Sequence, residues 1–333
     1  MIADFLGGGD AWKTESPGES DDICATRRCL AALASGDSSP SLDCGESGST
    51  LRFLRPVAAA LGKRPHFVMR GRLSQRPGIE YDTLEPGLFR LPGDVSSQFA
   101  TGLLFALPLL GGDSEIEFAT PPESLGYVEM TLDVLAASGI EIARTERGYR
   151  IPGRQSYRLP PGMEAETDWS GAAFWLAMNR LGSDVRVEGL DRNSHQPDRA
   201  VEALLAQRGG EKDMAQCPDL FPALAAVSGA ENAVTAFTSI RRLRRKESDR
   251  VAAMASMLAT RGVKTEENEE RFIVHGIGRR YGGGCAVKTF SDHRIAMAAA
   301  VAASAADAPI GIDDGGCVAK SYPGFFAEYA ALG

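Results

Sequence analysis

The chain has 333 residues, of which 44% are hydrophobic and 24% are charged, and its net charge is -8. This length and composition are typical of a globular protein with two domains of roughly 150 residues each. No run of about 18 apolar residues is present, so no membrane-spanning helix is expected, and the acidic balance argues against nucleic acid as a partner.

The cysteines and histidines do not follow the spacing of a metal site. The six cysteines form no CxxC pair and the four histidines are scattered, so neither a zinc site nor a disulfide framework is expected. Buried, reduced thiols are the better interpretation. The N-terminal segment has no basic region and only a short apolar stretch, which argues against a secretory signal and makes the cytoplasm the expected location.

The predicted elements begin after an irregular lead-in over residues 1–19, which are rich in Gly, Ser and acids. Beyond it, a short polar cluster repeatedly precedes a run of small apolar residues, as at a capped helix start. The predicted helices span residues 46–62, 93–110, 167–182, 217–229, 246–262 and 291–304. Alternating polar and apolar residues predict strands at 64–71, 114–119, 140–151, 184–190 and 271–278.

The order of these elements indicates the fold class and the domains. Strands that alternate with helices indicate an α/β fold built from repeated units. The stretch 158–167, which contains Pro and Gly, is the expected hinge. It gives a first domain over residues 20–165 and a second domain over residues 166–333.

Basic side chains gather at the predicted helix starts and in two loops. A helix N-terminus presents free N–H groups and the positive end of a dipole, which suits phosphate and carboxylate. Two acids, Asp219 and Glu247, lie among the basic residues, and this combination fits proton transfer on an anionic substrate. The basic residues are Arg52, Arg76, Lys246, Arg250, Arg294 and Lys320.

Each of these patterns, taken singly, also fits an ordinary structural role. The GDVSSQF string fits a helix cap, and KESDR fits ion pairs along a solvated helix face. Asp219 fits a cap before a helix start that proline interrupts, and a lone histidine such as His293 is more often structural than catalytic. Spacing alone therefore leaves both interpretations open.

The order of nine strings favours the functional interpretation. GESGSTLRF, RGRLSQRPG, LPGDVSSQF, SLGYVEMTLDVL, TDWSGAAFWLA, CPDLFPALAA, LRRKESDRVAAM, SDHRIAMAAA and VAKSYPGFF follow one another as similar strings do in EPSP synthases. From about Ser20 to its end, the chain therefore resembles the EPSP synthase (3-phosphoshikimate 1-carboxyvinyltransferase) family. The resemblance implies two similar domains of repeated βαβαββ units that close over the substrates, with the first unit incomplete in this chain.

The resemblance also implies an activity. Members of this family transfer the enolpyruvyl group of phosphoenolpyruvate to the 5-hydroxyl of shikimate-3-phosphate and release phosphate. They serve chorismate and aromatic amino acid biosynthesis and use no metal or organic cofactor. The resemblance also implies that this protein is a monomer. Glyphosate competes with phosphoenolpyruvate in this family, and Gly48 leaves room for it.

Matched position by position, the resemblance implies a set of site residues. Asp219 is expected to engage the reacting hydroxyl and Glu247 to serve the methylene carbon, so both are catalytic candidates. Arg52 is expected to support the Gly48 turn. The expected contacts of shikimate-3-phosphate are Ser96, Ser97, Gln98, Ser124, Tyr127, Asp219 and Lys246. The expected contacts of phosphoenolpyruvate are Gly48, Arg76, Gln98, Arg250, Arg294 and Lys320.

Two departures from the family pattern keep alternatives open. The family's opening Pro-x-x-Lys-Ser segment has no match in residues 1–19, and the neighbours of Lys13 differ from it, so little turnover is expected from the chain as written. Arg242 stands where some members place a substrate-binding Asn. One alternative is an impaired remnant that only binds anions. The other is a UDP-N-acetylglucosamine enolpyruvyl transferase, but that family has a reactive Cys in the loop that here reads RGRLSQRPG.

Overall fold

The computed structural model describes residues 1–332, which form two compact units, one over residues 1–165 and one over residues 166–332. Each unit has its own hydrophobic core. The boundary between the units falls inside the stretch 158–167. Among the described residues, no helix has both the length and the apolar character needed to cross a membrane.

Each unit contains one complete βαβαββ repeat. In the first unit the repeat is β3 (Leu88–Leu91), α4 (Ser97–Ala106), β4 (Ser114–Phe118), α5 (Leu125–Ala137), β5 (Ala143–Arg144) and β6 (Gly148–Ile151). In the second unit it is β7 (Gly210–Asp213), α8 (Phe221–Ala230), β8 (Val234–Thr238), α9 (Arg250–Ala259), β9 (Lys264–Glu267) and β10 (Arg271–His275). The repeated α/β architecture is therefore confirmed.

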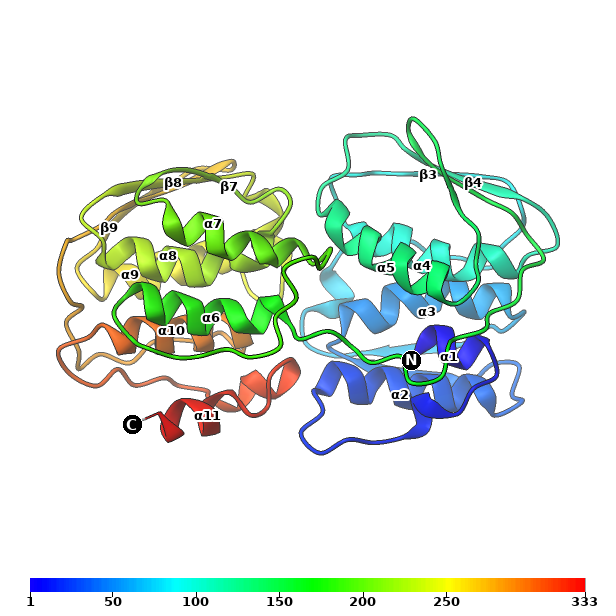
Figure 1. The fold of residues 1–333 in the computed structure, drawn as a ribbon, viewed down its shortest axis with the longest axis horizontal. Coiled ribbons are helices and arrows are strands. Elements are labelled where there is room, and N and C mark those ends of the chain that lie inside the picture. The colour runs from blue at the N-terminus through cyan, green and yellow to red at the C-terminus, as the bar shows by residue number, and fades with distance from the viewer. Residues whose placement is uncertain (333) are drawn as a thin grey trace. The chain divides into compact units, whose positions relative to one another are not determined.

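The two repeats also share one sheet topology. The strand orders are β3-β4-β6-β5 and β7-β8-β10-β9. In both sheets the first two strands are parallel and the last strand of the repeat pairs antiparallel with both of its neighbours. The two helices of each repeat lie on one face of their sheet, as Figure 1 shows for α4 with α5 and for α8 with α9.

A shorter parallel unit precedes the first complete repeat. It comprises β1 (Ser41–Gly45), α3 (Gly48–Ala60) and β2 (His66–Met69), and β1 pairs in parallel with β2. Helix α2 (Asp21–Ala34) packs on β1, and α3 packs along α4. Between β2 and β3, residues 70–87 contain one 3-10 helix, Leu73–Gln75, where the complete repeats have a second helix and a hairpin.

The second unit packs three apolar helices against one another. These are α6 (Trp169–Arg180), α8 and α10 (His293–Ser304). Residues 221–229 of α8 are all buried, as expected for a helix that is apolar around its whole circumference. Isolated parallel bridges join Tyr281 to Ala306 and Val287 to Ile312 on either side of α10. The shorter helices α7 (Val201–Ala206) and α11 (Phe325–Ala331) complete this unit.

The prediction is wrong for residues 1–19 and 184–190, and the predicted strand 140–151 is divided into β5 and β6. Residues 1–19 are not an irregular lead-in, because they include helix α1 (Ile2–Leu6) and a 3-10 helix over Ala11–Lys13, and Trp12 is buried against Phe5. Residues 184–190 are not a strand. The N–H and C=O groups of Val185 both bond to the side-chain amide of Asn179, so they are not available to a neighbouring strand.

Candidate functional site

The predicted site residues all follow strands that pair in parallel. Three of these pairings are strand pairs, β1 with β2, β3 with β4 and β7 with β8, and the fourth is the isolated parallel bridge between Val287 and Ile312. The carboxyl ends of parallel strands share one sheet edge, and helices start there with free N–H groups. The residues that follow these four pairs are Gly48 with Arg76, residues 96–98 with Ser124 and Tyr127, Asp219 with residues 246–250, and Arg294 with Lys320.

In the first unit, Arg52 lies among three predicted residues, Gln98, Gly48 and Arg76. Its NH1 group donates to Gln98 Oε1 at 2.7 Å, and its NH2 group donates to the Pro77 carbonyl at 3.0 Å, beside Arg76. A Cβ atom on Gly48 would lie 2.9 Å from Arg52 NH1 and 3.1 Å from Arg76 NH1. The Gly48 backbone therefore lies close to two guanidinium groups, and the support of its turn by Arg52 stays a prediction.

The start of α4 lies next to the start of α5. Ser96 caps α4 by accepting from the Gln98 N–H at 3.3 Å, and Ser97 is buried in its first turn. Ser124 precedes α5 with a left-handed φ of 57° and is 2% exposed. A non-glycine residue in this region is uncommon, and such strain is often found at functional sites. Tyr127, half-buried, follows in the first turn of α5.

In the second unit, Arg250 is the centre of a cluster of charges. Its guanidinium group is 1% exposed and contacts Asp219 at 2.7 Å, Glu247 at 2.8 Å and Asp292 at 2.9 Å. A planar guanidinium can hold several carboxylates in fixed directions, which an ammonium cannot do. Arg250 thus fixes the orientation of both predicted catalytic acids.

Two more cations hold Asp219. Lys246 Nζ lies 3.3 Å from Oδ1 of Asp219, and Arg294 NH2 lies 3.3 Å from Oδ2. Burial by itself would raise the pKa of Asp219, but Arg294, Lys246 and Arg250 together hold that pKa well below its ordinary value. Asp219 is therefore an ionised acceptor at neutral pH, and it is 19% exposed, so a ligand can reach it.

The sequence analysis missed Asp292 as a site residue. Its side chain is fully buried and accepts from Arg250 Nε at 2.9 Å, from Ser248 Oγ at 2.9 Å and from the Arg294 N–H at 3.0 Å. It is also the N-cap of α10. Its position directly before His293 and Arg294, at the start of a predicted helix, is the signal that identifies it as a cap.

His293 has a structural role in this cluster. The ring is 4% exposed, and Nδ1 lies 3.7 Å from the Asp292 carboxylate. Burial is the main cause that lowers the pKa of His293 to about 3. Arg294 and Arg250 lower this pKa further, while Asp292 and Glu247 act in the opposite direction. The ring is therefore neutral at physiological pH, in keeping with the structural interpretation of a lone histidine.

Two further positions in the second unit are Lys320, an expected contact of phosphoenolpyruvate, and Arg242, the departure from the family pattern. Lys320, in a 3-10 helix over Gly316–Lys320, is 8% exposed. Arg242 donates to the Ala215 carbonyl at 2.7 Å, at the end of β7. No group of three or more His, Cys, Asp or Glu side chains within residues 1–332 is arranged to hold a metal ion.

The arrangement of the second unit suits anion binding combined with proton transfer. Three carboxylates, from Asp219, Glu247 and Asp292, face three cations, from Lys246, Arg250 and Arg294. Because the charges balance, each acid is held without a large unpaired charge in a partly buried site. Fixed charges of this kind need little rearrangement when charge develops on a substrate.

Comparisons with known proteins find close relatives. The family model described as EPSP synthase (3-phosphoshikimate 1-carboxyvinyltransferase) matches residues 77–212 and 198–329. A 3-phosphoshikimate 1-carboxyvinyltransferase of Clostridium kluyveri is 40% identical, over 88% of this chain and 78% of the relative. The protein of the same name from Clostridioides difficile is 36% identical, over 88% of this chain and 76% of the relative.

Solved structures are similar in fold. The EPSP synthase of Acinetobacter baumannii superposes with a TM-score of 0.75 at 21% identity, covering 95% of this chain and 88% of that chain. The enolpyruvyl transferase NikO of Streptomyces tendae superposes with a TM-score of 0.61 at 18% identity, covering 76% of this chain and 65% of that chain.

Proposed function

The chain belongs to the EPSP synthase family, and from this premise we propose that it converts phosphoenolpyruvate and shikimate-3-phosphate to 5-enolpyruvylshikimate-3-phosphate and phosphate. The observation that carries this proposal is the identity of 40% to a 3-phosphoshikimate 1-carboxyvinyltransferase over 88% of the chain. The chain is thus an enzyme of the shikimate branch. The alternatives, a remnant that only binds anions and a UDP-N-acetylglucosamine transferase, are not favoured.

Phosphoenolpyruvate carries a phosphate and a carboxylate, so its site needs several fixed cations. We assign Arg76, Arg250, Arg294 and Lys320 to this role, together with Gly48 and Gln98. Support comes from the approach of Arg76 to the Gly48 backbone and from the bond that holds Gln98 on Arg52. The absence of a side chain at Gly48 lets ligand atoms come close to the first turn of α3.

Shikimate-3-phosphate carries its own phosphate, which suits the polar starts of α4 and α5. We assign this substrate to Ser96, Ser97, Gln98, Ser124 and Tyr127, and its hydroxyl-bearing ring to Asp219 and Lys246. The supporting observation is that both helices begin after parallel strands, with hydroxyl side chains and free N–H groups at their first turns.

Asp219 and Glu247 divide the two proton transfers of the reaction. Asp219, held ionised by its cations, accepts the proton of the 5-hydroxyl as the oxygen attacks C2 of phosphoenolpyruvate. Glu247 exchanges a proton with the C3 methylene carbon, which is protonated on addition and deprotonated when phosphate leaves. Arg250 contacts both acids, so it keeps them at fixed, separate points.

We also propose a monomer that works in the cytoplasm. All six cysteines lie in the described residues as free thiols, which fits a reducing compartment. Both proposed substrates are phosphorylated and do not cross membranes unaided, so the enzyme is expected in the compartment where they are made.

The test is a measurement of phosphate release from phosphoenolpyruvate with and without shikimate-3-phosphate, with the product identified by NMR. Phosphate release that requires shikimate-3-phosphate, with a new enol ether at its 5-oxygen, is the expected result. Calorimetric titration of each substrate gives a second readout that does not depend on turnover. Failure of both substrates to bind, or phosphate release driven by UDP-N-acetylglucosamine instead, would contradict the proposal.

A further inference from the structure

A hollow of about 340 Å³ lies at the C-terminal half of α3, within the first unit. Its position follows from the incomplete repeat. In the complete repeats a second helix packs beside the first, as α5 does on α4 and α9 on α8. After β2 no such helix is present in the described chain, and residues 79–83 run past the exposed flank of α3 instead.

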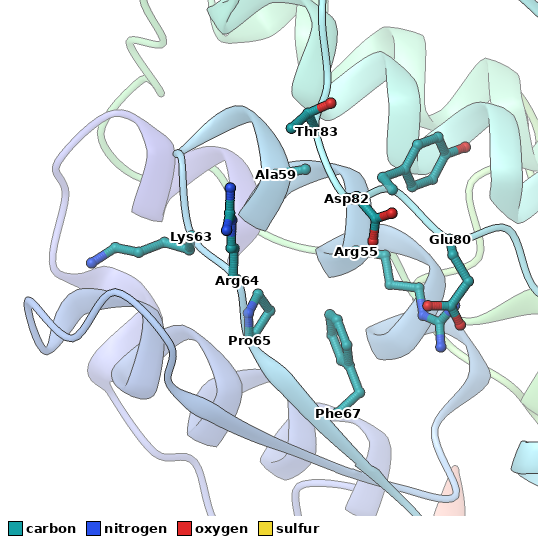
Figure 2. A pocket seen from close by; sticks show the side chains of 10 residues that line it. Arg55, Ala59, Lys63, Arg64, Pro65, Phe67, Glu80, Asp82 and Thr83 are labelled. Atoms are coloured by element: carbon teal, nitrogen blue, oxygen red, sulfur yellow. The ribbon is translucent and has the colours of Figure 1, made fainter.

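The two sides of this hollow carry opposite charges. Figure 2 shows Arg64 on one side and Asp82 on the other, with Pro65 and Phe67 along the base in this view. Neither Arg64 nor Asp82 has an ion-pair partner within 4 Å among residues 1–332. By contrast, Lys63 donates to the Asp37 carbonyl at 2.6 Å, and Glu80 pairs with Arg55.

A buried donor adds to these two charges. The side chain of Arg55 is 10% exposed and its guanidinium carbon lies 5.3 Å from the centre of the Phe67 ring. Its NH1 group donates to the Ile79 carbonyl at 3.3 Å, but its buried Nε has no hydrogen-bond acceptor in the described chain. Arg55 therefore lines the hollow as a buried cation that Glu80 and the Ile79 carbonyl already hold in place.

We propose that this hollow is a binding site for a small zwitterion with a flat apolar body, of the class of an amino acid with an aromatic side chain. The carboxylate would lie at Arg64, the ammonium at Asp82 on the opposite side, and the ring against Phe67 and Pro65. A simple anion would leave Asp82 unpaired beside it, and a simple cation would do the same to Arg64, so the lining selects against both. The volume lies at the lower end of the range for ligand pockets, about 300–1,000 Å³, which restricts the ligand to a small molecule.

The test compares three probes of one shape by isothermal titration calorimetry. They are phenylalanine, 3-phenylpropanoate, which lacks the ammonium, and 2-phenylethylamine, which lacks the carboxylate. Phenylalanine is expected to bind about 3-fold more tightly than either, because each analogue loses one ion pair with an exposed side chain. Saturation with phosphoenolpyruvate and shikimate-3-phosphate is not expected to displace it, so the result does not depend on the proposed function.

Two variants assign the charges. Arg64→Gln is expected to remove the preference over 2-phenylethylamine, and Asp82→Asn the preference over 3-phenylpropanoate. Arg28→Gln, an exposed arginine on α2, is the matched control and is expected to leave all three affinities unchanged. Circular dichroism of each variant checks the fold. Absence of phenylalanine binding up to about 10 mM, equal binding of the three probes, or affinities that neither variant alters would each overturn the proposal.

Discussion

Arg250 determines the geometry of the second unit's cluster more than its stability. A buried ion pair often contributes little net free energy, because the cost of removing both charges from water offsets their attraction. The fully buried guanidinium nonetheless contacts three carboxylates that come from different segments of the chain. The benefit is preorganisation, since Asp219 and Glu247 are held in place before a substrate arrives.

Gly48→Ala tests the close approach of backbone and guanidinium groups in the first unit. The new methyl group would lie 2.9 Å from Arg52 NH1 and 3.1 Å from Arg76 NH1, so both side chains must move. We expect KM for phosphoenolpyruvate to rise by about 10-fold or more, with glyphosate inhibition weakened at least as much. Gly111→Ala is the control, because an added Cβ there has no neighbour within 4 Å. Unchanged kinetics in Gly48→Ala would show that the pocket is misplaced.

Arg294→Ala tests the assignment of substrates to cations. Arg294 lies 3.3 Å from Asp219 and is 11% exposed. Loss of this charge is expected to weaken phosphoenolpyruvate binding by about 2–5 kcal/mol and shikimate-3-phosphate binding much less. Calorimetric titration of each ligand measures both effects. Arg280→Ala, at an exposed pair with Asp307, is the control, and an equal loss for the two ligands in Arg294→Ala would remove the assignment.

At the scale of elements, capped helix starts carry most of the proposed site. Ser47, Ser96, Asp168, Asp249 and Asp292 each accept a hydrogen bond from a backbone N–H in the first turn of a helix. The same local rule therefore serves stability and function. It places capping groups and ligand-binding groups on one edge of each sheet, because both depend on the free N–H groups there.

The caps Asp249 and Asp292 differ in their surroundings, because only Asp292 also pairs with a fully buried arginine, and this difference can be tested. Asp249 caps α9 at the surface, so Asp249→Ala is expected to reduce the free energy of unfolding by about 1 kcal/mol. Asp292→Ala also removes one of the three carboxylates that balance Lys246, Arg250 and Arg294, so the partly buried cluster keeps one uncompensated positive charge, and a loss of about 3–5 kcal/mol is expected. Urea denaturation measures both values.

Asp292→Asn separates the two functions of Asp292. Asparagine caps a helix as well as aspartate does, but it carries no charge to pair with Arg250. Stability in Asp292→Asn is therefore expected to stay close to that of Asp292→Ala. Recovery of most of the lost stability would show that the cap, and not the ion pair, is the dominant contribution.

At the scale of the whole molecule, His293 couples stability to pH. Its pKa falls from 6.5 in the unfolded chain to about 3 in the folded protein, chiefly because the ring is buried. The unfolded state therefore binds a proton between these values that the folded state does not. The free energy of unfolding is therefore not reduced by His293 well above pH 6.5. As the pH falls below this value, protonation of the unfolded chain lowers the free energy of unfolding by up to about 1.4 kcal/mol per pH unit.

This dependence is measured by denaturation between pH 7 and pH 4, above the range in which Asp292 titrates. His293→Gln is expected to flatten the loss of stability across that interval, whatever its effect at pH 7. His66→Gln, at an exposed position on β2, is the control and is expected to keep the slope of the parent. A parent slope that survives in His293→Gln would contradict the buried, neutral ring.

Much of the fold and of the site follows from local sequence. All six predicted helices exist, because polar caps followed by Ala- and Leu-rich runs favour helices wherever they occur. Strands β1, β3, β7, β8 and β9 were not predicted. Strand β7, with the sequence GEKD, has the composition of a loop, and its Lys212 is buried because Nζ donates to the carbonyls of Leu204 and Gln207.

The sequence by itself determined the family, the α/β class and the types of residue proposed to bind the substrates, since ordered motifs and helix caps are local properties of the chain. Tertiary structure alone decided that Asp292 joins Arg250, 42 positions away, and that Asn179 takes the backbone bonds of Val185. It also decided that a hollow forms where the unit of α3 lacks a second helix after β2. Burial and pairing depend on which segments meet in space, and no periodicity along the chain records that.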